Sequence, residues 1–396
     1  MDVDVAIVGA GLVGASLAAA LAGSGLKLAL IERRPPPSPD PDWDARIYSL
    51  SPASIAFLQS VGAWQRIDAA RVSPIHAMRI FGDDGRSRLE FSAYEAGVLE
   101  LAATVESGRL QSALWQGLER QRNLTLLCPA VSTRLQRNRS AVEIQLENAE
   151  PVSARLVVGA DGANSWVRRA AGIEVASRSY GHDGVVANFA CERAHRNIAY
   201  QWFRDDGVLA YLPLPQNQIS IVWSTPAAQA RELLALSPEA LCSRVAAAGE
   251  RTLGELRLVT PAAAYPLNRI TARPMVQPRI ALIGDAAHVV HPLAGQGVNL
   301  GFGDAHALAG LLSAAPAGDA GDYLLLRRFE RARAEDILAF RWVTDGLFHL
   351  FGARHPALAR ARNFGLNLTD RVPVIKTLLA RRAMGIGGGF HQEESR

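Results

Sequence analysis

Three glycines and a carboxylate near the N-terminus are spaced to hold a dinucleotide. Gly9, Gly11 and Gly14 follow a short β-branched run, and Glu32, with Arg33 beside it, follows the next apolar run. In a strand–turn–helix–strand unit, such glycines permit the turn, the approach of a pyrophosphate, and close packing of the helix. The helix N-terminus attracts the phosphates, and the carboxylate accepts hydrogen bonds from a ribose hydroxyl. The pattern predicts binding of FAD or NAD, with a merely structural turn as the alternative.

Two later strand ends also place an acidic residue beside a glycine. Asp161 and Gly162 follow the predicted strand 155–158, and Asp285 follows the apolar residues 280–283. Because Asp285 also begins an Ala-rich helical segment, its carboxylate can act as a hydrogen-bond acceptor there. A helix cap without a ligand is the alternative for Asp285.

A loop rich in Pro and Gly, residues 291–297, leads into an apolar helix predicted over residues 298–312. Its glycines let the backbone touch a flat ring, and the helix dipole can stabilise negative charge on that ring as it is reduced. The candidates for ring contact are Pro292, Gly295, Gln296, Gly297, Val298 and Asn299. His291 is a candidate catalytic residue, with a structural histidine beside a proline turn as the alternative.

The motifs GxGxxG, GADGANSxVR and GDAAHxxHPLAGQGVNLG together resemble the three signatures of the class A flavoprotein aromatic hydroxylases. The resemblance extends over residues 3 to about 310, in the order and spacing of that family. It implies that Asp285 binds the ribityl chain of FAD and that the 292–297 loop holds the isoalloxazine. It ties Asp161 and Gly162 to both FAD and NAD(P)H. Arg168 belongs to the second motif, with a helical salt bridge as its alternative.

Further segments resemble one branch of that family, the ubiquinone-biosynthesis hydroxylases. Residues 44–51 resemble its DxRxxALS pattern, and residues 105–114 resemble its VExxxLQxAL helix. The resemblance puts Arg46 near the flavin, and puts Arg109 and Gln111 against the FAD phosphate or ring. A plain surface arginine remains the alternative for Arg46.

The resemblance implies an aromatic-ring monooxygenase that uses FAD, O₂ and either NADH or NADPH. In such enzymes oxygen reaches a phenol ring through a flavin C4a-hydroperoxide, and the branch points to a polyprenylated phenol. The backbone of Pro292 is the candidate for polarising the substrate hydroxyl, and no catalytic base can be named. The chain has no second GxGxxG, which suits a family in which the nicotinamide visits transiently.

Two other classes of function stay open. The first is a flavoenzyme of different chemistry, a reductase of prenyl double bonds or a halogenase. A halogenase is disfavoured because the sequence contains no WxWxIP motif. The second is a non-catalytic flavoprotein subunit of a biosynthetic complex, against which the intact 291–297 loop argues.

The intervening segments predict a mixed α/β fold in which two domains interleave. Residues 73–100 and 178–272 alternate apolar and polar positions between turn signals, which indicates antiparallel hairpins of a β-sheet substrate domain. The remaining segments form a Rossmann-like FAD-binding domain, then C-terminal helices and a flexible tail. The expected bounds are 1–72, 101–177 and 273–335 for the FAD-binding domain, 336–384 for the helices and 385–396 for the tail. Tyr211 and Pro213 are expected to line the substrate side, with a core role as the alternative, and Trp223 is expected near a channel for the apolar part of the substrate.

The composition fits a globular protein with no nucleic-acid partner. Of 396 residues, 49% are hydrophobic, and the net charge is only +4. Three scattered cysteines indicate neither a disulfide framework nor a metal site, which favours a reducing, cytoplasmic setting. The arginine-rich stretches 327–333 and 354–362 are expected to be solvated helix faces. Peripheral contact with the inner membrane face or with a biosynthetic complex stays open, as does the oligomeric state.

One stretch could be mistaken for a membrane helix. Residues 5–26 carry no charged side chain and are nearly all apolar or Gly. The glycines divide this stretch, however, and the chain begins with the acidic residues Asp2 and Asp4 rather than a cationic segment. We therefore expect a strand, a phosphate-binding turn and a helix of a globular domain.

Overall fold

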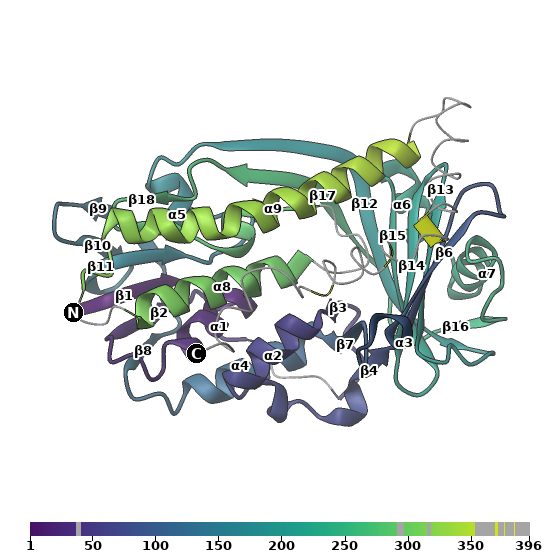
Figure 1. The fold of residues 1–396 in the computed structure, drawn as a ribbon, viewed down its shortest axis with the longest axis horizontal. Coiled ribbons are helices and arrows are strands. Elements are labelled where there is room, and N and C mark those ends of the chain that lie inside the picture. Colours follow the sequence, from purple (N-terminus) through teal and green to yellow (C-terminus); the bar gives the residue numbers. More distant parts are fainter. Residues whose placement is uncertain are drawn as a thin grey trace.

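The chain folds around two large β-sheets joined by long helices and strands (Figure 1). The computed structural model describes residues 1–36, 41–290, 297–314 and 318–352, and also Thr369, Asp370, Lys376 and Met384. At positions 343, 344 and 347–352 only the backbone is described. The predicted mixed α/β fold is confirmed.

The first sheet has eight strands, and its centre is parallel. Its main path runs β18-β19-β11-β1-β2-β8, with β10 and β9 added antiparallel beside β11. The strands are β1 (Asp2–Val8), β2 (Leu28–Ile31), β8 (Leu124–Leu127), β9 (Ser132–Arg137), β10 (Val142–Leu146), β11 (Ala149–Gly159), β18 (Val276–Gln277) and β19 (Ile280–Leu282). Residues from distant parts of the sequence thus meet where β1, β11 and β19 end.

Helices from both halves of the chain pack against this sheet and form its core. Helix α1 packs against both α4 and α8, and α8 packs against α9. These helices are α1 (Leu12–Ala20), α4 (Ser107–Leu118), α8 (Gly297–Ser313) and α9 (Tyr323–Gly352), with the shorter α5 (Trp166–Ala170) after β11. In Figure 1, α9 runs along the molecule from the first sheet toward the second.

The uncharged N-terminal stretch forms β1, a glycine turn and α1, as predicted. Val5, Ile7 and Leu17 are fully buried, because β1 is the inner strand between β11 and β2 and α1 is covered by α4 and α8. Among the described residues, no helix combines the length and the hydropathy that a membrane span needs.

The second sheet has nine strands and is mostly antiparallel. Its path runs β20-β17-β12-β15-β14-β13-β5-β6, with β16 beside β12. The strands are β5 (Ala77–Phe81), β6 (Arg88–Ser92), β12 (Val175–Cys191), β13 (Ile198–Arg204), β14 (Gly207–Leu214), β15 (Gln218–Pro226), β16 (Leu256–Leu258), β17 (Ala263–Ala272) and β20 (His288–Val289). Helices α6 (Ala227–Ala235) and α7 (Pro238–Ala248) cover one face and share its hydrophobic core.

A small three-stranded sheet lies beside the large ones. Its order is β3-β7-β4, with β3 (Ile47–Leu50), β4 (Ser73–Ile75) and β7 (Ala102–Glu106). The remaining elements are α2 (Pro52–Ser60), α3 (Ala93–Ala96) and the short 3-10 helices η1 (Trp64–Arg66), η2 (Ala69–Arg71) and η3 (Gly284–Ala286). The hydroxyl of Thr104 on β7 donates a 2.6 Å hydrogen bond to the carbonyl of Pro213 on β14. The small sheet therefore joins β14 to the segment that begins α4.

Some of the expected domain boundaries do not coincide with the boundaries between the sheets. Strand β4, expected in the substrate domain, pairs with β7, whereas β20, expected in the FAD-binding domain, pairs with β17. The boundary expected after residue 335 falls inside α9, which continues to Gly352. The proposed division into domains stays a prediction, and the tail 385–396 lies outside the described residues.

Candidate functional site

The turn after β1 is tightly packed at two glycines and open at the third. A Cβ at Gly9, whose φ is +100°, would lie 2.5 Å from the carbonyl oxygen of Ala160. A Cβ at Gly14 would lie 1.9 Å from the carbonyl oxygen of Gly9. At Gly11, by contrast, a Cβ would meet no atom within 4 Å. Open space at the first turn of α1, where helix N–H groups lack intrahelical partners, suits a pyrophosphate.

Glu32 holds the end of β2 against this turn. Its carboxylate accepts hydrogen bonds from the backbone N–H of Ala10 at 2.7 Å and of Arg34 at 3.1 Å. Each carboxylate oxygen keeps further acceptor capacity, which a ribose hydroxyl could use. Arg33 is solvent-exposed beside it.

Asp161 organises the second turn and leaves one oxygen over. Its Oδ2 accepts from the backbone N–H of Trp166 at 2.6 Å and of Val167 at 3.0 Å, which begins α5. Its Oδ1 is buried and has no hydrogen-bond partner among the described residues. Such an orphan acceptor is costly unless a donor from outside the protein completes it. Gly162 follows with a φ of +77° and no atom within 4 Å of a Cβ position.

Arg168 ties the second motif to the third. It is 6% exposed and donates to the carbonyl of Ala286 at 2.8 Å and to that of Ala163 at 2.8 Å. Burial lowers the pKa of its guanidinium. Arg168 therefore bridges two backbone segments, and no salt bridge of its guanidinium is found within the described ranges.

Asp285 presents an exposed carboxylate at the start of the third motif. Its side chain is reached by solvent, yet desolvation by the surrounding protein raises its pKa, against the charges of His288 and Arg46. Arg46 lies over the ring of Tyr48 at 5.4 Å, and the pKa of Tyr48 is raised by burial. The structure thus brings Asp285 near Arg46, two residues that the sequence separately assigned to the flavin. No described residue donates a hydrogen bond to the Asp285 carboxylate, so its oxygens remain for a ligand hydroxyl.

A buried network that the sequence did not predict holds the Asp285 turn in place. Asp304 in α8 is 0% exposed and accepts from Gly284 N–H at 2.9 Å, His288 Nε2 at 2.6 Å and Arg333 Nε at 2.9 Å. Burial alone would raise the pKa of Asp304, but His288 and Arg333 outweigh it and hold the pKa below its usual range. The expectation that Arg333 lies on a solvated face was wrong, since Arg333 is 4% exposed. The available signal was Asp304 itself, an acidic residue within an apolar helix.

The start of α8 offers backbone groups rather than a side chain. Asn299 Nδ2 donates to the carbonyl of Ser49 at 2.9 Å, and its Oδ1 accepts from Ser51 N–H at 3.0 Å. Asn299 therefore joins α8 to the segment between β3 and α2. The N–H groups near Gly297 and Val298 begin the helix and point to its N-terminal side. His291, Pro292, Gly295 and Gln296 lie outside the described residues.

Glu106, at the end of β7, forms ion pairs with Arg71 and with Arg109; Glu106 and Arg109 belong to the segment 105–114. It is 1% exposed and accepts from Arg71 through two bonds of 2.7 Å and from Arg109 Nε at 2.9 Å. Gln111 is half-buried on α4, one turn from the network. On the same helix, Trp115 Nε1 donates to the carbonyl of Ala10 at 2.9 Å. Helix α4 therefore adjoins the glycine turn, and within the described residues no hydrogen bond joins Arg109 or Gln111 directly to that turn.

Two of the three expected substrate residues lie away from this site. Tyr211 and Trp223 are each 1% exposed in the core beneath α6 and α7, and the Tyr211 hydroxyl donates to the carbonyl of Val245 at 2.6 Å. Side chains alternate along a strand, so the neighbouring Leu212 and its cross-strand partner Ser220 point to the other face. Pro213 lies where β14 meets β7. The structure thus places both side chains in the core, the role that stood as the alternative for Tyr211.

Part of the sheet face opposite α7 reaches the small sheet and the segment before β3. Leu212 clusters there with Ile75, Ala102 and Ala199. Asn188 shares that face through its pairing with Ser220, and its Nδ2 donates to the carbonyl of Asp44 at 2.9 Å. Within the described residues, no group of three or more His, Cys, Asp or Glu side chains could hold a metal ion.

The residues of the site fit FAD. The groups complementary to its pyrophosphate and hydroxyls are an open turn at Gly11, spare acceptor capacity at Glu32, the orphan oxygen of Asp161 and the exposed Asp285 carboxylate. A family model described as "FAD binding domain" matches residues 2–338. Together these observations make FAD the cofactor.

Characterised relatives match along nearly the whole chain. The chain is 37% identical over 389 residues to the 3-demethoxyubiquinol 3-hydroxylase of Escherichia coli (strain K12), covering 97% of this chain and 98% of that protein. It is 36% identical to ubiquinone hydroxylase UbiL of Rhodospirillum rubrum, covering 96% and 89%. It is 33% identical to the mitochondrial ubiquinone biosynthesis monooxygenase COQ6 of Drosophila melanogaster, covering 96% and 90%.

Solved structures share the fold at lower identity. PqsL of Pseudomonas aeruginosa, solved in complex with 2-aminobenzoylacetate, has a TM-score of 0.77 at 23% identity, covering 92% of this chain and 100% of that one. The p-nitrophenol 4-monooxygenase PnpA of Pseudomonas putida DLL-E4 has a TM-score of 0.79 at 17% identity, covering 98% and 99%. The chain belongs to the FAD binding domain family and, within it, to the ubiquinone-biosynthesis branch of the class A flavoprotein monooxygenases, enzymes that use FAD and NAD(P)H to hydroxylate an aromatic ring.

Proposed function

We propose that this enzyme hydroxylates the ring of a polyprenylated phenol or quinol intermediate of ubiquinone biosynthesis. The observation that carries the proposal is the match, along 97% of the chain, to a 3-demethoxyubiquinol 3-hydroxylase. The matches to UbiL and to COQ6 support the same substrate class. A core-facing position for Tyr211 and Trp223 leaves the substrate side to the opposite face of the second sheet, around Leu212.

Different described residues would bind different parts of FAD. The N-terminal groups of α1, reached past Gly11, would bind the pyrophosphate, and Glu32 would accept from the adenosine ribose. Asp285 would accept from the ribityl hydroxyls, and Asp304 keeps it oriented through the N–H of Gly284. FAD, reduced by NADH or NADPH, supplies the chemistry by which one oxygen atom of O₂ enters the ring.

The remaining site residues stay proposals. Arg46 would stand near the flavin on the strength of its proximity to Asp285. The backbone N–H groups at Gly297 and Val298 would face the pyrimidine edge of the flavin, where the α8 dipole favours negative charge. Proposed roles in the loop before α8 are ring contact for Gly295 and Gln296 and substrate contact for His291 and Pro292. Arg33, Arg109 and Gln111 are proposed as FAD contacts from sequence alone.

We further propose that the enzyme works at a membrane surface. A polyprenyl chain partitions into a bilayer, so the ring of such a substrate must be collected from lipid or handed over by a partner protein. Peripheral contact through α9 and the residues that follow it would serve the first route, and assembly in a biosynthetic complex would serve the second.

The test is product analysis with isotopically labelled oxygen. FAD-loaded enzyme, NADH or NADPH, ¹⁸O₂ and a short-chain prenylated 3-demethoxyquinol are incubated in detergent, and the product mass is measured. We expect one labelled oxygen in the ring. A product that instead gains two hydrogens on the prenyl chain would overturn the proposal in favour of a prenyl reductase. Bound FAD that no nicotinamide reduces, with or without substrate, would favour a non-catalytic subunit.

A further inference from the structure

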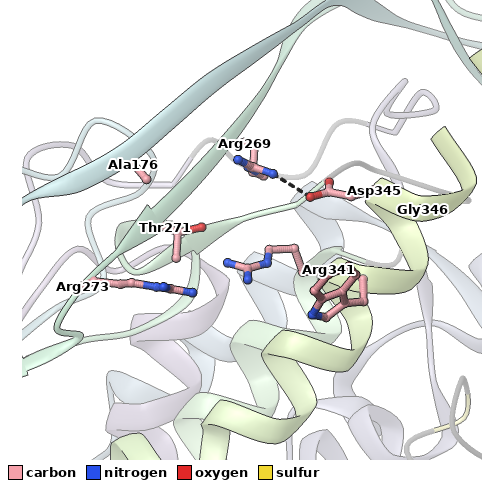
Figure 2. Close-up of a pocket in the computed structure, with 8 residues that line it drawn as sticks. Ala176, Arg269, Thr271, Arg273, Arg341, Asp345 and Gly346 are labelled. Carbon is pink, nitrogen blue, oxygen red and sulfur yellow. Dashed lines mark hydrogen bonds and ion pairs between the residues drawn. The ribbon is translucent and has the colours of Figure 1, made fainter. Parts of the chain in front are cut away.

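A pocket lies between β17 of the second sheet and α9. Its volume is about 480 Å³, within the ~300–1,000 Å³ range of small-molecule sites. Figure 2 shows arginines reaching it from both sides: Arg269 and Arg273 from β17 and the residue after it, and Arg341 from α9. Asp345 and Trp342, also on α9, line the pocket as well.

The pocket carries more positive than negative charge. Asp345 is its lining carboxylate, and both its oxygens are engaged, Oδ2 by Arg269 at 2.8 Å and Oδ1 by the hydroxyl of Tyr180 at 2.5 Å. Arg178 on β12 pairs directly across from Arg269 on β17, an arrangement in which like charges destabilise a sheet. Within the described ranges, no carboxylate oxygen lies within 4.0 Å of the guanidinium of Arg178 or Arg273.

Arg341 lies close enough to Arg269 and Arg273 for their charges to oppose its own. Burial lowers the pKa of its guanidinium, the charges of Arg273 and Arg269 lower it further, and Asp345 counteracts them only in part. Clustered guanidinium groups that repel one another are stabilised by a shared anion, and their planar donors match the oxygens of a phosphate. The charge of the pocket therefore indicates a phosphate-bearing ligand.

Two exposed apolar side chains of α9 lie at or next to this pocket: Trp342 lines it, and Leu338 precedes Trp342 on the helix. The Trp342 indole is 73% exposed, and Leu338, one helical turn before it, is 38% exposed. An indole with an apolar body and a polar N–H is typical of side chains at the boundary between water and lipid. A soluble phosphate would need only the arginines, whereas a lipid headgroup would also explain the exposed apolar side chains beside them.

We propose that this pocket binds the phosphate headgroup of an anionic phospholipid, and that Trp342 and Leu338 insert at the membrane surface beside it. The inference deepens the proposed function, which supplies the reason for a membrane encounter. The binding itself requires no turnover, so the two proposals can fail separately.

The test is co-sedimentation of the FAD-loaded enzyme with vesicles, without substrate or NAD(P)H. We expect stronger binding to vesicles containing phosphatidylglycerol than to phosphatidylcholine vesicles, and weaker binding as salt rises. The double variant Arg273→Gln/Arg341→Gln should lose about fivefold in affinity for each arginine removed. Trp342→Ala should weaken binding at every salt concentration.

Arg331→Gln is the matched control, because Arg331 is an exposed arginine on the same helix that does not line the pocket. It should change vesicle affinity less than twofold. Equal binding to both vesicle types by the wild type, or equal affinity of the double variant and the Arg331→Gln variant, would overturn the inference. FAD content measured for each variant verifies that it is folded.

Soluble phosphates distinguish the remaining ligand source. The rate of FAD reduction by NADPH and competition of vesicle binding by glycerol phosphate are measured for the wild type and the double variant. A double variant with unchanged vesicle binding but slowed reduction at low NADPH would assign the pocket to the nicotinamide nucleotide, and the lipid inference would be wrong. Loss of hydroxylation with intact vesicle binding would contradict only the proposed function.

Discussion

At the scale of single residues, cofactor binding should depend most directly on the Asp285 carboxylate. Replacement by Asn removes the charge but keeps the shape, so the hydrogen bonds to ligand hydroxyls lose their ionic contribution. A hydrogen bond to a charged group contributes about 1.5–3 kcal/mol, which predicts a fall in FAD affinity of roughly tenfold to a hundredfold. Titration of apoprotein with FAD, followed by flavin fluorescence, measures this. Asp205→Asn, in the exposed turn between β13 and β14, is the control. Unchanged affinity in the Asp285→Asn variant would remove Asp285 from the site.

Asp304 acts at the same scale but through its neighbours. Asp304→Asn removes the negative charge that lies 2.9 Å from Nε of the buried Arg333 guanidinium. Breaking one side of a buried ion pair costs about 3–5 kcal/mol, and we expect a loss of that order in the free energy of unfolding. Chemical denaturation measures it. Asp336→Asn, at the outer partner of Arg333, should cost less than about 1 kcal/mol, because its side chain is 32% exposed.

The depressed pKa of Asp304 also predicts how stability depends on pH. A carboxyl with a lower pKa in the folded than in the unfolded chain stabilises the fold above the unfolded pKa, and this contribution is lost as pH falls through the folded pKa. The unfolded value is about 3.9. The difference in unfolding free energy between wild type and Asp304→Asn should therefore be constant at neutral pH and shrink below about pH 4. A difference that instead shrinks on alkaline titration would contradict the assigned ionisation.

At the scale of elements, two glycines of the turn between β1 and α1 have different roles: Gly14 allows close packing, and Gly11 leaves space for a ligand. Gly14→Ala would place a Cβ 1.9 Å from the carbonyl oxygen of Gly9, and overpacking of this kind costs about 1–3 kcal/mol. Gly11→Ala meets no protein atom within 4 Å and has an ordinary φ of −66°. It should change stability by less than about 0.5 kcal/mol while obstructing FAD.

Thermal denaturation of the two apoproteins, paired with FAD titrations, checks this separation. The Gly14→Ala variant should unfold at a lower temperature than wild type, and the Gly11→Ala variant at the same temperature but with weakened FAD binding. Full FAD affinity in a stable Gly11→Ala variant would mean that the pyrophosphate does not approach the turn there.

The two faces of β14 make a further prediction at this scale. Tyr211→Phe removes the hydrogen bond to Val245 beneath α7, so the free energy of unfolding should fall by about 1 kcal/mol. The KM for the quinol substrate should stay the same, because the ring lies on the face covered by the helices. A raised KM with unchanged stability would return Tyr211 to the substrate side.

These same elements mark what the sequence could and could not predict. The glycine spacing predicted the β1–α1 turn because its chemistry is local. The sequence predicted antiparallel hairpins over residues 178–272, but such periodicity does not say which face of a strand meets the substrate. Tyr211 and Trp223, expected on the substrate side, lie in the core beneath α6 and α7. The Asp304 network joins His288 and Arg333, which lie 16 and 29 residues away, and no local pattern reports such a meeting.

At the scale of the whole molecule, the proposed FAD site joins segments that are far apart in the chain. The glycine turn and Glu32 lie within the first 32 residues, and Asp161 lies in the middle of the chain. Asp285 and the start of α8 lie in the last third. A ligand that binds all of them stabilises the folded chain by RT ln(1 + [L]/Kd), about 4 kcal/mol at a thousandfold excess over Kd. ADP, the part of FAD that needs only the N-terminal turn and Glu32, should stabilise less than FAD at equal concentration.

Thermal shifts in the two ligands therefore map the site across the fold. For the wild type we expect a larger shift with FAD than with ADP. In the Asp285→Asn variant the FAD shift should shrink toward the ADP shift, while the ADP shift stays unchanged, because ADP does not reach the ribityl position. In Gly11→Ala both shifts should shrink. If Asp285→Asn lowered the ADP and FAD shifts equally, its effect would be a general loosening of the fold. The proposal that FAD contacts both the N-terminal turn and Asp285 would then be wrong.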